Sequence, residues 1–143
     1  MRRLIRATGT VLTALAVLFA SPQAVPAAGR DRDAALVDEF LGAYRDAVLG
    51  AGDTGWTPSE VRALYLTPEL NAALDRWAAD HTADPVFRAP HVPTGWSVRR
   101  ADGPVGAALT PVDATERWDD GSSLRVRYTV RVADRSITGL TGG

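Results

Sequence analysis

The sequence predicts an α+β domain in which three N-terminal helices pack on a curved, mainly antiparallel C-terminal sheet. In the first half of the chain, apolar residues recur at the spacing of one face of an α-helix. In the second half they alternate with polar residues, which is the pattern of a strand with one buried face. A stretch rich in proline and glycine over 84–95 separates the two halves. Because the sheet must bury its apolar face, we expect the helices to cover one side of it.

The chain begins with the three zones of a secretory signal peptide. Arg2, Arg3 and Arg6 make the start positive, an apolar run follows over 11–20, and small residues lead to a cleavage site after Ala27. The apolar run is about half as long as the roughly 20 residues that a membrane span needs. We therefore expect residues 1–27 to be a signal peptide and the protein to be secreted. An uncleaved anchoring helix is the alternative.

After the signal peptide we expect a short polar lead over 28–33 and a single α+β domain over 34–141, since the chain has 143 residues. The paired arginines raise the twin-arginine export route, but MRRLIR lacks the rest of that pattern, so the route stays open. The sequence contains no cysteine. This excludes disulfides and a lipid-modified N-terminal cysteine, so the core alone must stabilise the domain.

The charge balance argues against nucleic acid as a partner. Of the 16 basic residues, all arginine, 13 lie from residue 28 onward, where they face all 17 acidic residues and leave a net charge of −4. Nonspecific nucleic-acid binding needs excess positive charge to displace counterions. The sequence also has neither a phosphate-cradling glycine loop nor a serine elbow, and we expect no cofactor.

Helix boundaries are indicated by local signals. The first helix has apolar residues at helical spacing over 36–48 and should end at Gly50 and Gly52. Thr57-Pro58-Ser59-Glu60 predicts the start of a second helix, with a capping hydroxyl, proline at the first position and glutamate three residues after the cap. Thr67-Pro68 predicts a third helix by the same logic. Asp84-Pro85 should stop the helices, and Val86 and Phe87 predict that the following loop is ordered.

The strands follow from alternation. We expect strands over 96–100, over 105–118, over 124–132 and over 135–141, with a turn at 119–121. Apolar parity changes at Pro111, which predicts an edge or a bulge there. Arg125, Arg127 and Arg131 share the face opposite the apolar row of the third strand. They could bind an anion, or form a solvated face that discourages aggregation, with Asp113, Glu116 and Asp119 balancing them.

The chain resembles the nuclear-transport-factor-2-like superfamily, which includes ketosteroid isomerase and SnoaL-type polyketide cyclases. The resemblance covers about residues 33–140. The residues that carry it are VDEFLGAYRDAV, YLTPEL with the helix of Trp77, DPVFRA, the strand of Trp96, and the closing ITGL. It implies a cone-like fold whose curved sheet encloses a cavity that relatives use for apolar ligands or partner subunits. Catalytic signatures of the isomerase and cyclase groups do not carry over, and the fold alone fixes no function.

One cluster resembles a reactive site. His81, Asp84 and His91 could do general acid–base work, or could hold zinc as two histidines and an aspartate. Against this, His81 ends a helix, where an imidazolium interacts favourably with the dipole, and His91 lies in a proline-rich loop. We expect structural roles for both histidines and no metal site. The weak catalytic candidates are His81, Asp84 and Tyr65.

Aromatic residues are the candidates for ligand contact. They recur at helical or strand spacing, so they could equally belong to the core. The residues that we expect to line a pocket are Tyr44, Trp77, His91, Trp96 and Trp118. Trp77→Ala tests the two roles, because a core tryptophan costs about 3–5 kcal/mol when truncated.

The sequence favours an exported, non-catalytic domain that binds a small apolar ligand or a partner protein. One alternative is an isomerase- or cyclase-like enzyme with Asp84 or His81 as general base and Tyr65 as hydrogen-bond donor. Another is a homodimeric module that pairs through an open sheet face. An enzyme needs an ionisable group in an enclosed pocket, a binder needs an apolar cavity, and a dimer needs an exposed apolar face.

Overall fold

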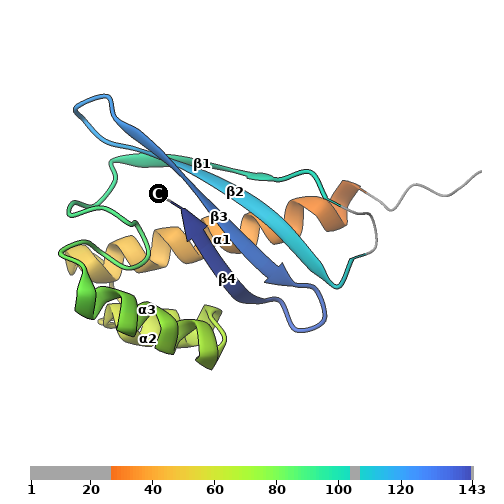
Figure 1. Cartoon of the computed structure of the whole chain (residues 1–143), viewed down its shortest axis with the longest axis horizontal. Helices are drawn as coiled ribbons and strands as arrows, with labels where there is room; N and C mark the ends of the chain where they lie inside the picture. The colour runs from red at the N-terminus through yellow and green to blue at the C-terminus, as the bar shows by residue number, and fades with distance from the viewer. Residues whose placement is uncertain (1–26, 104–106, 143) are drawn as a thin grey trace, which may run out of the picture.

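The structure, a computed structural model, describes residues 27–103 and 107–142, with side chains from residue 32 onward. Three helices precede four strands along the chain (Figure 1). These elements are α1 (Ala27–Leu49), α2 (Pro58–Tyr65), α3 (Pro68–Asp80), β1 (Gly95–Arg100), β2 (Leu109–Arg117), β3 (Ser123–Arg131) and β4 (Ser136–Gly142). Their order and pairing confirm the predicted α+β fold class. Within this part of the chain, no helix is both long and apolar enough to span a bilayer.

The first helix begins earlier than the sequence pattern indicated. Residues 28–33, expected as a polar lead, lie inside α1. They contain no proline and a single glycine, so their sequence does little to interrupt a helix. The helix ends as predicted, because Gly50 has a φ of +64°, a left-handed conformation that favours glycine. The amide of Ala51 then donates to the carbonyl of Asp46 at 2.9 Å, which closes the last turn.

Both threonines that were predicted to cap helices do so. Oγ1 of Thr57 accepts from the amide of Glu60 at 3.3 Å, and the carboxylate of Glu60 accepts from the amide of Thr57 at 2.8 Å. This reciprocal pair is a capping box. Thr67 accepts from the amide of Leu70 at 3.4 Å, and Pro68 occupies the first turn of α3. The two helix starts are therefore confirmed.

The segment between α3 and β1 is an ordered crossing loop. Val86 and Phe87 are fully buried, and the amide of Asp84 donates to the carbonyl of Ala89 at 2.9 Å. Arg88 has a φ of +55°. That left-handed conformation costs a residue other than glycine about 1 kcal/mol. The crossing loop therefore buries its apolar residues while holding one strained residue beside them.

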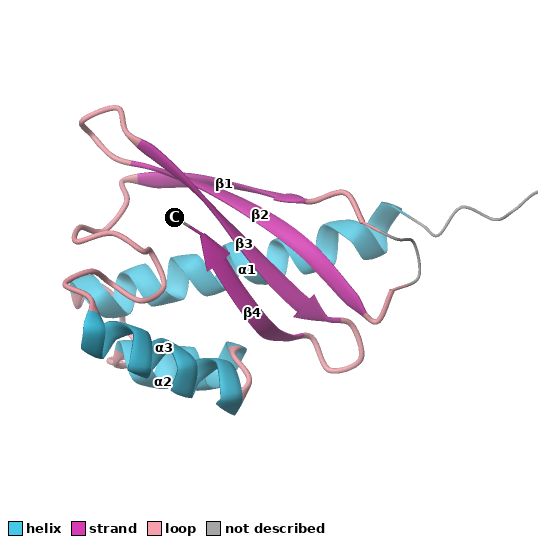
Figure 2. Cartoon of the chain, viewed as in Figure 1, coloured by secondary structure: helices cyan, strands magenta, loops and turns pink. Residues whose placement is uncertain are grey.

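The strands form one antiparallel sheet in the order β1-β2-β3-β4 (Figure 2). In the register, Val98 of β1 lies opposite Ala114 of β2, which lies opposite Val126 of β3. The pairing of β3 with β4 shifts between Thr129 and Val130. Such an irregularity increases local twist, and the resulting sheet is curved and not closed.

Pro111 makes no bulge in β2, but it lies just past the last β1–β2 residue pair, where the β1 side of β2 becomes an edge. The strand runs without a break through Pro111, which lies opposite Thr129 on β3, and β2 is an inner strand. The carbonyl of Pro111 accepts from the amide of Ala101 at 2.9 Å, so the peptide groups of Pro111 point toward β1. Because these groups point away from β3, the missing N–H costs the β2–β3 ladder no bond, and on the other side β1 has already ended at Arg100. Val105, expected in this strand, lies outside the described residues.

The helices and the crossing loop lie against one face of the sheet, which we call the inner face (Figures 1 and 2). The helix α1 contacts β1 and β2, and α3 contacts β4. The amide of Thr67, between α2 and α3, donates to the carbonyl of Ile137 at 3.0 Å. The buried side chains of the inner face are Val112, Ala114, Glu116, Val126, Tyr128, Val130, Ile137 and Leu140. Helices on one side thus supply the cover that the sequence predicts.

The other, outer face of the sheet is rich in arginine. Its guanidinium groups come from Arg99, Arg117, Arg125, Arg127 and Arg131, all exposed. Glu116 was expected to balance such charges, but it shares the parity of Val112 and Ala114 and therefore points to the inner face. Asp113 is the acidic residue of the described strands that does lie on the outer face. The charges of the two faces are therefore arranged differently from the expectation.

Candidate functional site

Asp84 is held by three hydrogen bonds at the start of the crossing loop. Its Oδ1 accepts from the amides of Val86 and Phe87 at 2.8 and 2.9 Å. Its Oδ2 accepts from the hydroxyl of Tyr44, on α1, at 3.0 Å. Burial raises the pKa of Tyr44 well above its usual range, and the neighbouring Asp84 carboxylate raises it further. Both predicted site residues therefore meet, in a contact that orders the loop.

Glu116 is an ionisable residue that the sequence reasoning placed on the wrong face. It is fully buried, and neither carboxyl oxygen has a hydrogen-bond partner among the described residues. Burial raises the pKa of Glu116 to about 8, and the charge of Asp84 raises it in the same direction. At neutral pH the group is therefore a protonated, neutral carboxylic acid.

Tyr128 and Arg88 complete a polar group inside an aromatic core. Tyr128 is fully buried, its hydroxyl has no partner within the described chain, and burial raises its pKa well above the usual range. Its ring meets that of Phe40 edge-on, with centroids 6.3 Å apart. Burial lowers the pKa of Arg88, whose Nε is likewise without a partner there. The charges of Glu116 and Asp84 raise the pKa of Tyr128 further, and the charge of Arg88 lowers it.

A neutral carboxylic acid can donate a hydrogen bond and can exchange a proton with a bound molecule. Such chemistry needs access to a substrate. Glu116 and Tyr128 are fully covered by the folded chain, and the four clefts described for the protein do not include either of them. In this conformation the polar group is therefore enclosed.

His81 and Trp77 form a stacked pair at the end of α3. His81 is the C-cap, as expected, and its Nδ1 lies 2.7 Å from the carbonyl oxygen of Trp77. The two rings are parallel within 6°, with centroids 3.9 Å apart. The guanidinium of Arg88 lies 4.1 Å from the centre of the Trp77 ring. Trp77 thus joins the helix end to the crossing loop instead of entering the main core.

His91 and Trp118 are brought together, as a shared ligand site would require. The indole Nε1 of Trp118 donates to the carbonyl of His91 at 3.0 Å. The two residues line two surface clefts of about 260 Å³ each, next to the β2–β3 turn. In the described part of the chain, no three histidine, cysteine or acidic side chains gather closely enough to hold a metal ion.

Trp96 and Tyr65 are tied to α1 and lie apart from that pair. Nε1 of Trp96 donates to Asp38 at 2.8 Å, and the hydroxyl of Tyr65 donates to Glu39 at 2.8 Å. Burial and the Glu39 carboxylate raise the pKa of Tyr65 to about 12. Because Tyr65 bonds to Glu39 and Tyr44 bonds to Asp84, the proposed Asp84–Tyr65 pairing is not found. The predicted pocket residues are therefore distributed over several places.

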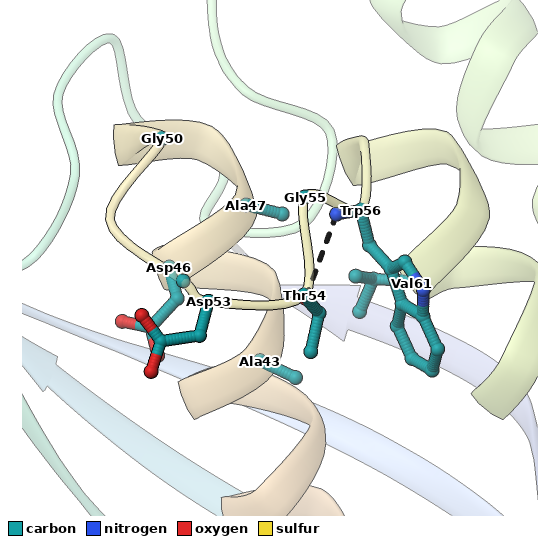
Figure 3. Close-up of a pocket in the computed structure, with 10 residues that line it drawn as sticks. Ala43, Asp46, Ala47, Gly50, Asp53, Thr54, Gly55, Trp56 and Val61 are labelled. Atoms are coloured by element: carbon teal, nitrogen blue, oxygen red, sulfur yellow. Dashed lines mark hydrogen bonds between the residues drawn. The ribbon is translucent and has the colours of Figure 1, made fainter.

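A cleft of about 310 Å³ lies where α1 ends and α2 begins, and we call it the α1–α2 cleft (Figure 3). Its apolar lining comes from Ala43 and Ala47 on α1, Val61 on α2, and Trp56 in the connecting loop. Trp56 is 45% exposed, which is unusual for a tryptophan. Concave, mainly apolar surfaces of this size are typical of small-ligand sites.

One side of the α1–α2 cleft is acidic. Asp46 on α1 and Asp53 in the loop lie on the same side, away from Trp56 (Figure 3). Gly50 and Gly55 have φ values of +64° and +66°, so the loop makes two turns that favour glycine. The cleft thus has an apolar part beside a negatively charged rim.

The sequence reasoning missed this cleft. Trp56 interrupts a run that is otherwise glycine, aspartate and threonine, and it lies outside every helical or strand periodicity. A large aromatic residue in a loop that cannot bury it was the available signal. The tyrosine and tryptophan candidates were chosen for periodicity, which selects residues that pack.

The comparisons with known proteins give a fold but no family. No protein-family model matches the chain, and no curated protein matches it. A crystal structure of a protein of unknown function from Bacteroides thetaiotaomicron VPI-5482, at 2.10 Å resolution, superposes with a TM-score of 0.60. The two chains are 19% identical, and the match covers 78% of this chain and 90% of that one. A likeness at this identity shows the fold alone.

Proposed function

We propose that this protein is an exported, non-catalytic domain that binds a small ligand with an apolar body in the α1–α2 cleft. The observation that carries the proposal is the half-exposed Trp56, which lines this cleft together with Ala43, Ala47 and Val61. Contact between apolar surface and water is unfavourable in free energy, so burying this surface against a ligand favours binding. Export rests on the sequence pattern of residues 1–27.

The acidic rim narrows the class of ligand. Asp46 and Asp53 attract a cationic end group, while Trp56 offers both apolar surface and a ring face for a cation. The ligand that fits best is therefore a small amphiphile with an amine at one end and an aliphatic or aromatic body.

Binding is better supported than catalysis. Asp84 would have to release hydrogen bonds to act as a base, and His81 is engaged by its stack and its contact with the Trp77 carbonyl. The homodimer alternative calls for an exposed apolar sheet face, whereas the described outer face carries arginines. Membership of the nuclear-transport-factor-2-like superfamily is part of this proposal, and three helices on one face of a curved sheet are consistent with it.

The proposal is tested with hexylamine, hexanol and hexanoate, which share one aliphatic body and differ in charge. In a thermal unfolding assay we expect hexylamine to raise the melting temperature most, hexanol less, and hexanoate least. Trp56→Ala should abolish the hexylamine shift, and Asp46→Asn should reduce it to the hexanol level. Leu64→Ala is the matched control, since Leu64 is exposed on α2 but does not line the cleft.

Equal shifts for the three compounds, or an unchanged hexylamine shift in Trp56→Ala, would contradict the proposal. Export is tested separately by the N-terminal sequence of protein recovered from culture medium, which should begin after Ala27.

A further inference from the structure

The outer face of the sheet carries a groove lined by the side chains of three of its arginines, Arg99 from β1 and Arg125 and Arg127 from β3. Arg100 also borders the groove, but it lies opposite Val112, so its side chain belongs to the other face of the strand. The groove has a volume of about 260 Å³, and Asp102 and Asp113 also line it. We call it the arginine groove. Its formal charge is positive, because the three guanidinium groups of Arg99, Arg125 and Arg127 outnumber the two carboxylates.

The strand register assembles the groove around Asp113. On β2, Asp113 lies directly between Arg99 of β1 and Arg127 of β3. Arg127 donates to both carboxylate oxygens, through Nε at 2.7 Å and Nη2 at 3.1 Å. Asp113 is only 3% exposed, although it points outward, because the side chains around it cover it. The buried carboxylate therefore orients Arg127 in a fixed position.

Both carboxylate oxygens of Asp113 are engaged by Arg127. The hydrogen bond from Arg127 holds the pKa of Asp113 below its usual range, and the charges of Arg125 and Arg99 lower it further. Among the described residues, the ion pair of Asp113 is with Arg127, while Arg99 and Arg125 have no acidic partner within 4.0 Å. The guanidinium groups of Arg99 and Arg125 thus keep donors free, and the like charges around Asp113 repel each other.

We propose that the arginine groove binds a phosphate-type oxyanion. A tetrahedral oxyanion matches the positive charge of the groove, and guanidinium forks bind its oxygens in pairs. Its binding would relieve the repulsion among the free arginines. This site is separate from the α1–α2 cleft, whose rim has the opposite charge.

A merely solvated arginine face explains the arrangement less well. Arginines protect a sheet from aggregation when they lie on an edge strand, where backbone groups are unpaired. Arg125 and Arg127 lie on β3, which is paired on both sides by β2 and β4, so there is no edge for them to protect. The chain as a whole is slightly acidic, so this concentration of arginine on one surface does not follow from net charge.

Calorimetric titration with inorganic phosphate tests the proposal. The purified chain is titrated at pH 7.5 and about 50 mM ionic strength, and again with sodium chloride in place of phosphate. We expect saturable phosphate binding that Arg125→Gln and Arg99→Gln each weaken by about tenfold or more. Arg76→Gln, an exposed arginine on α3, is the matched control and should bind as the native chain does. Circular dichroism checks that the variants are folded.

A second arm separates the two sources of such an oxyanion. Vesicles containing phosphatidic acid are compared with vesicles of phosphatidylcholine in a sedimentation assay. Binding to the acidic vesicles that free phosphate displaces assigns the groove to a lipid headgroup, and phosphate binding without vesicle binding assigns it to a soluble phosphate. The proposal is overturned if phosphate binds no better than chloride, or if Arg125→Gln and Arg76→Gln bind phosphate equally.

Discussion

The hydroxyl of Tyr44 donates a hydrogen bond of 3.0 Å to Oδ2 of Asp84, which joins the middle of α1 to the start of the crossing loop. The other carboxylate oxygen of Asp84 accepts two amides of the same loop. Through these contacts the Asp84 carboxylate fixes the position of the loop segment that buries Val86 and Phe87 in the core.

The first prediction concerns this contact. Asp84→Ala removes three hydrogen bonds and should lower the free energy of unfolding by about 2–4 kcal/mol, whereas Tyr44→Phe removes one and should cost about 1 kcal/mol. Urea unfolding followed by circular dichroism measures both values. Asp80→Ala, an exposed residue at the end of α3, should change stability by less than about 0.5 kcal/mol. If Asp84→Ala resembled Asp80→Ala, Asp84 would be available for another role.

The second prediction concerns the proton on Glu116. Its pKa is about 8 in the folded chain, against an ordinary value of 4.5. Between these values the folded state holds a proton that the unfolded state has released, so this group makes stability fall as pH rises, by up to about 1.4 kcal/mol per pH unit. Its contribution is most favourable below pH 4.5 and is lost by pH 8.

Glu116→Gln cannot ionise and should remove that part of the pH dependence. We expect the variant to be the more stable protein above pH 8 and to approach native stability below pH 4.5. Urea unfolding of both chains from pH 4 to pH 9 gives the difference at each pH. Glu69→Gln, on the first turn of α3, controls for the loss of an exposed carboxylate. A constant difference across this range would show that Glu116 ionises normally.

The third prediction concerns Trp77, which packs on His81 and Arg88 and not in the main core. Trp77→Ala should cost about 1–2 kcal/mol, less than the 3–5 kcal/mol typical of a fully buried tryptophan. Thermal and urea unfolding measure this cost. Arg88→Gln should cost less than Trp77→Ala, because it removes the cation–π contact alone. A loss of 3 kcal/mol or more in Trp77→Ala would place Trp77 in the core after all.

The fourth prediction concerns the helix caps. Thr57→Ala and Thr67→Ala each leave an amide of the first turn without its side-chain acceptor, and each should lower stability by about 1 kcal/mol. Thr57→Ser retains the hydroxyl and serves as the control. Urea unfolding of the two single variants and of the double variant shows whether the losses add, as independent caps require. A double variant as stable as either single one would show that the two helix starts are coupled.

The features that sequence reasoning found are those that depend on near neighbours. Thr57, Thr67 and Gly50 act through residues within five positions, and the alternation of Val126 with Arg127 needs only a strand. Glu116 was expected on the solvated face because it is charged. Alternation from Val112 and Ala114 would have placed it on their buried face. That signal was present in the sequence.

The contents of the candidate sites were harder to predict, because they depend on register. Asp113 meets Arg99 and Arg127 only after three strands have been aligned, and no local pattern states that alignment. Likewise, Asp46 and Trp56 share a cleft because the intervening loop folds back at Gly50 and Gly55.

Pro111 has a consequence for how the sheet assembles. The amide of Ala101 donates to the carbonyl of Pro111, but Pro111 has no N–H to donate in return. If β1 slid by two residues toward this point, a carbonyl in the middle of the new ladder would lose its donor. The proline thus makes a slipped alignment of β1 on β2 less favourable. It favours the observed register, in which Arg99 lies opposite Asp113.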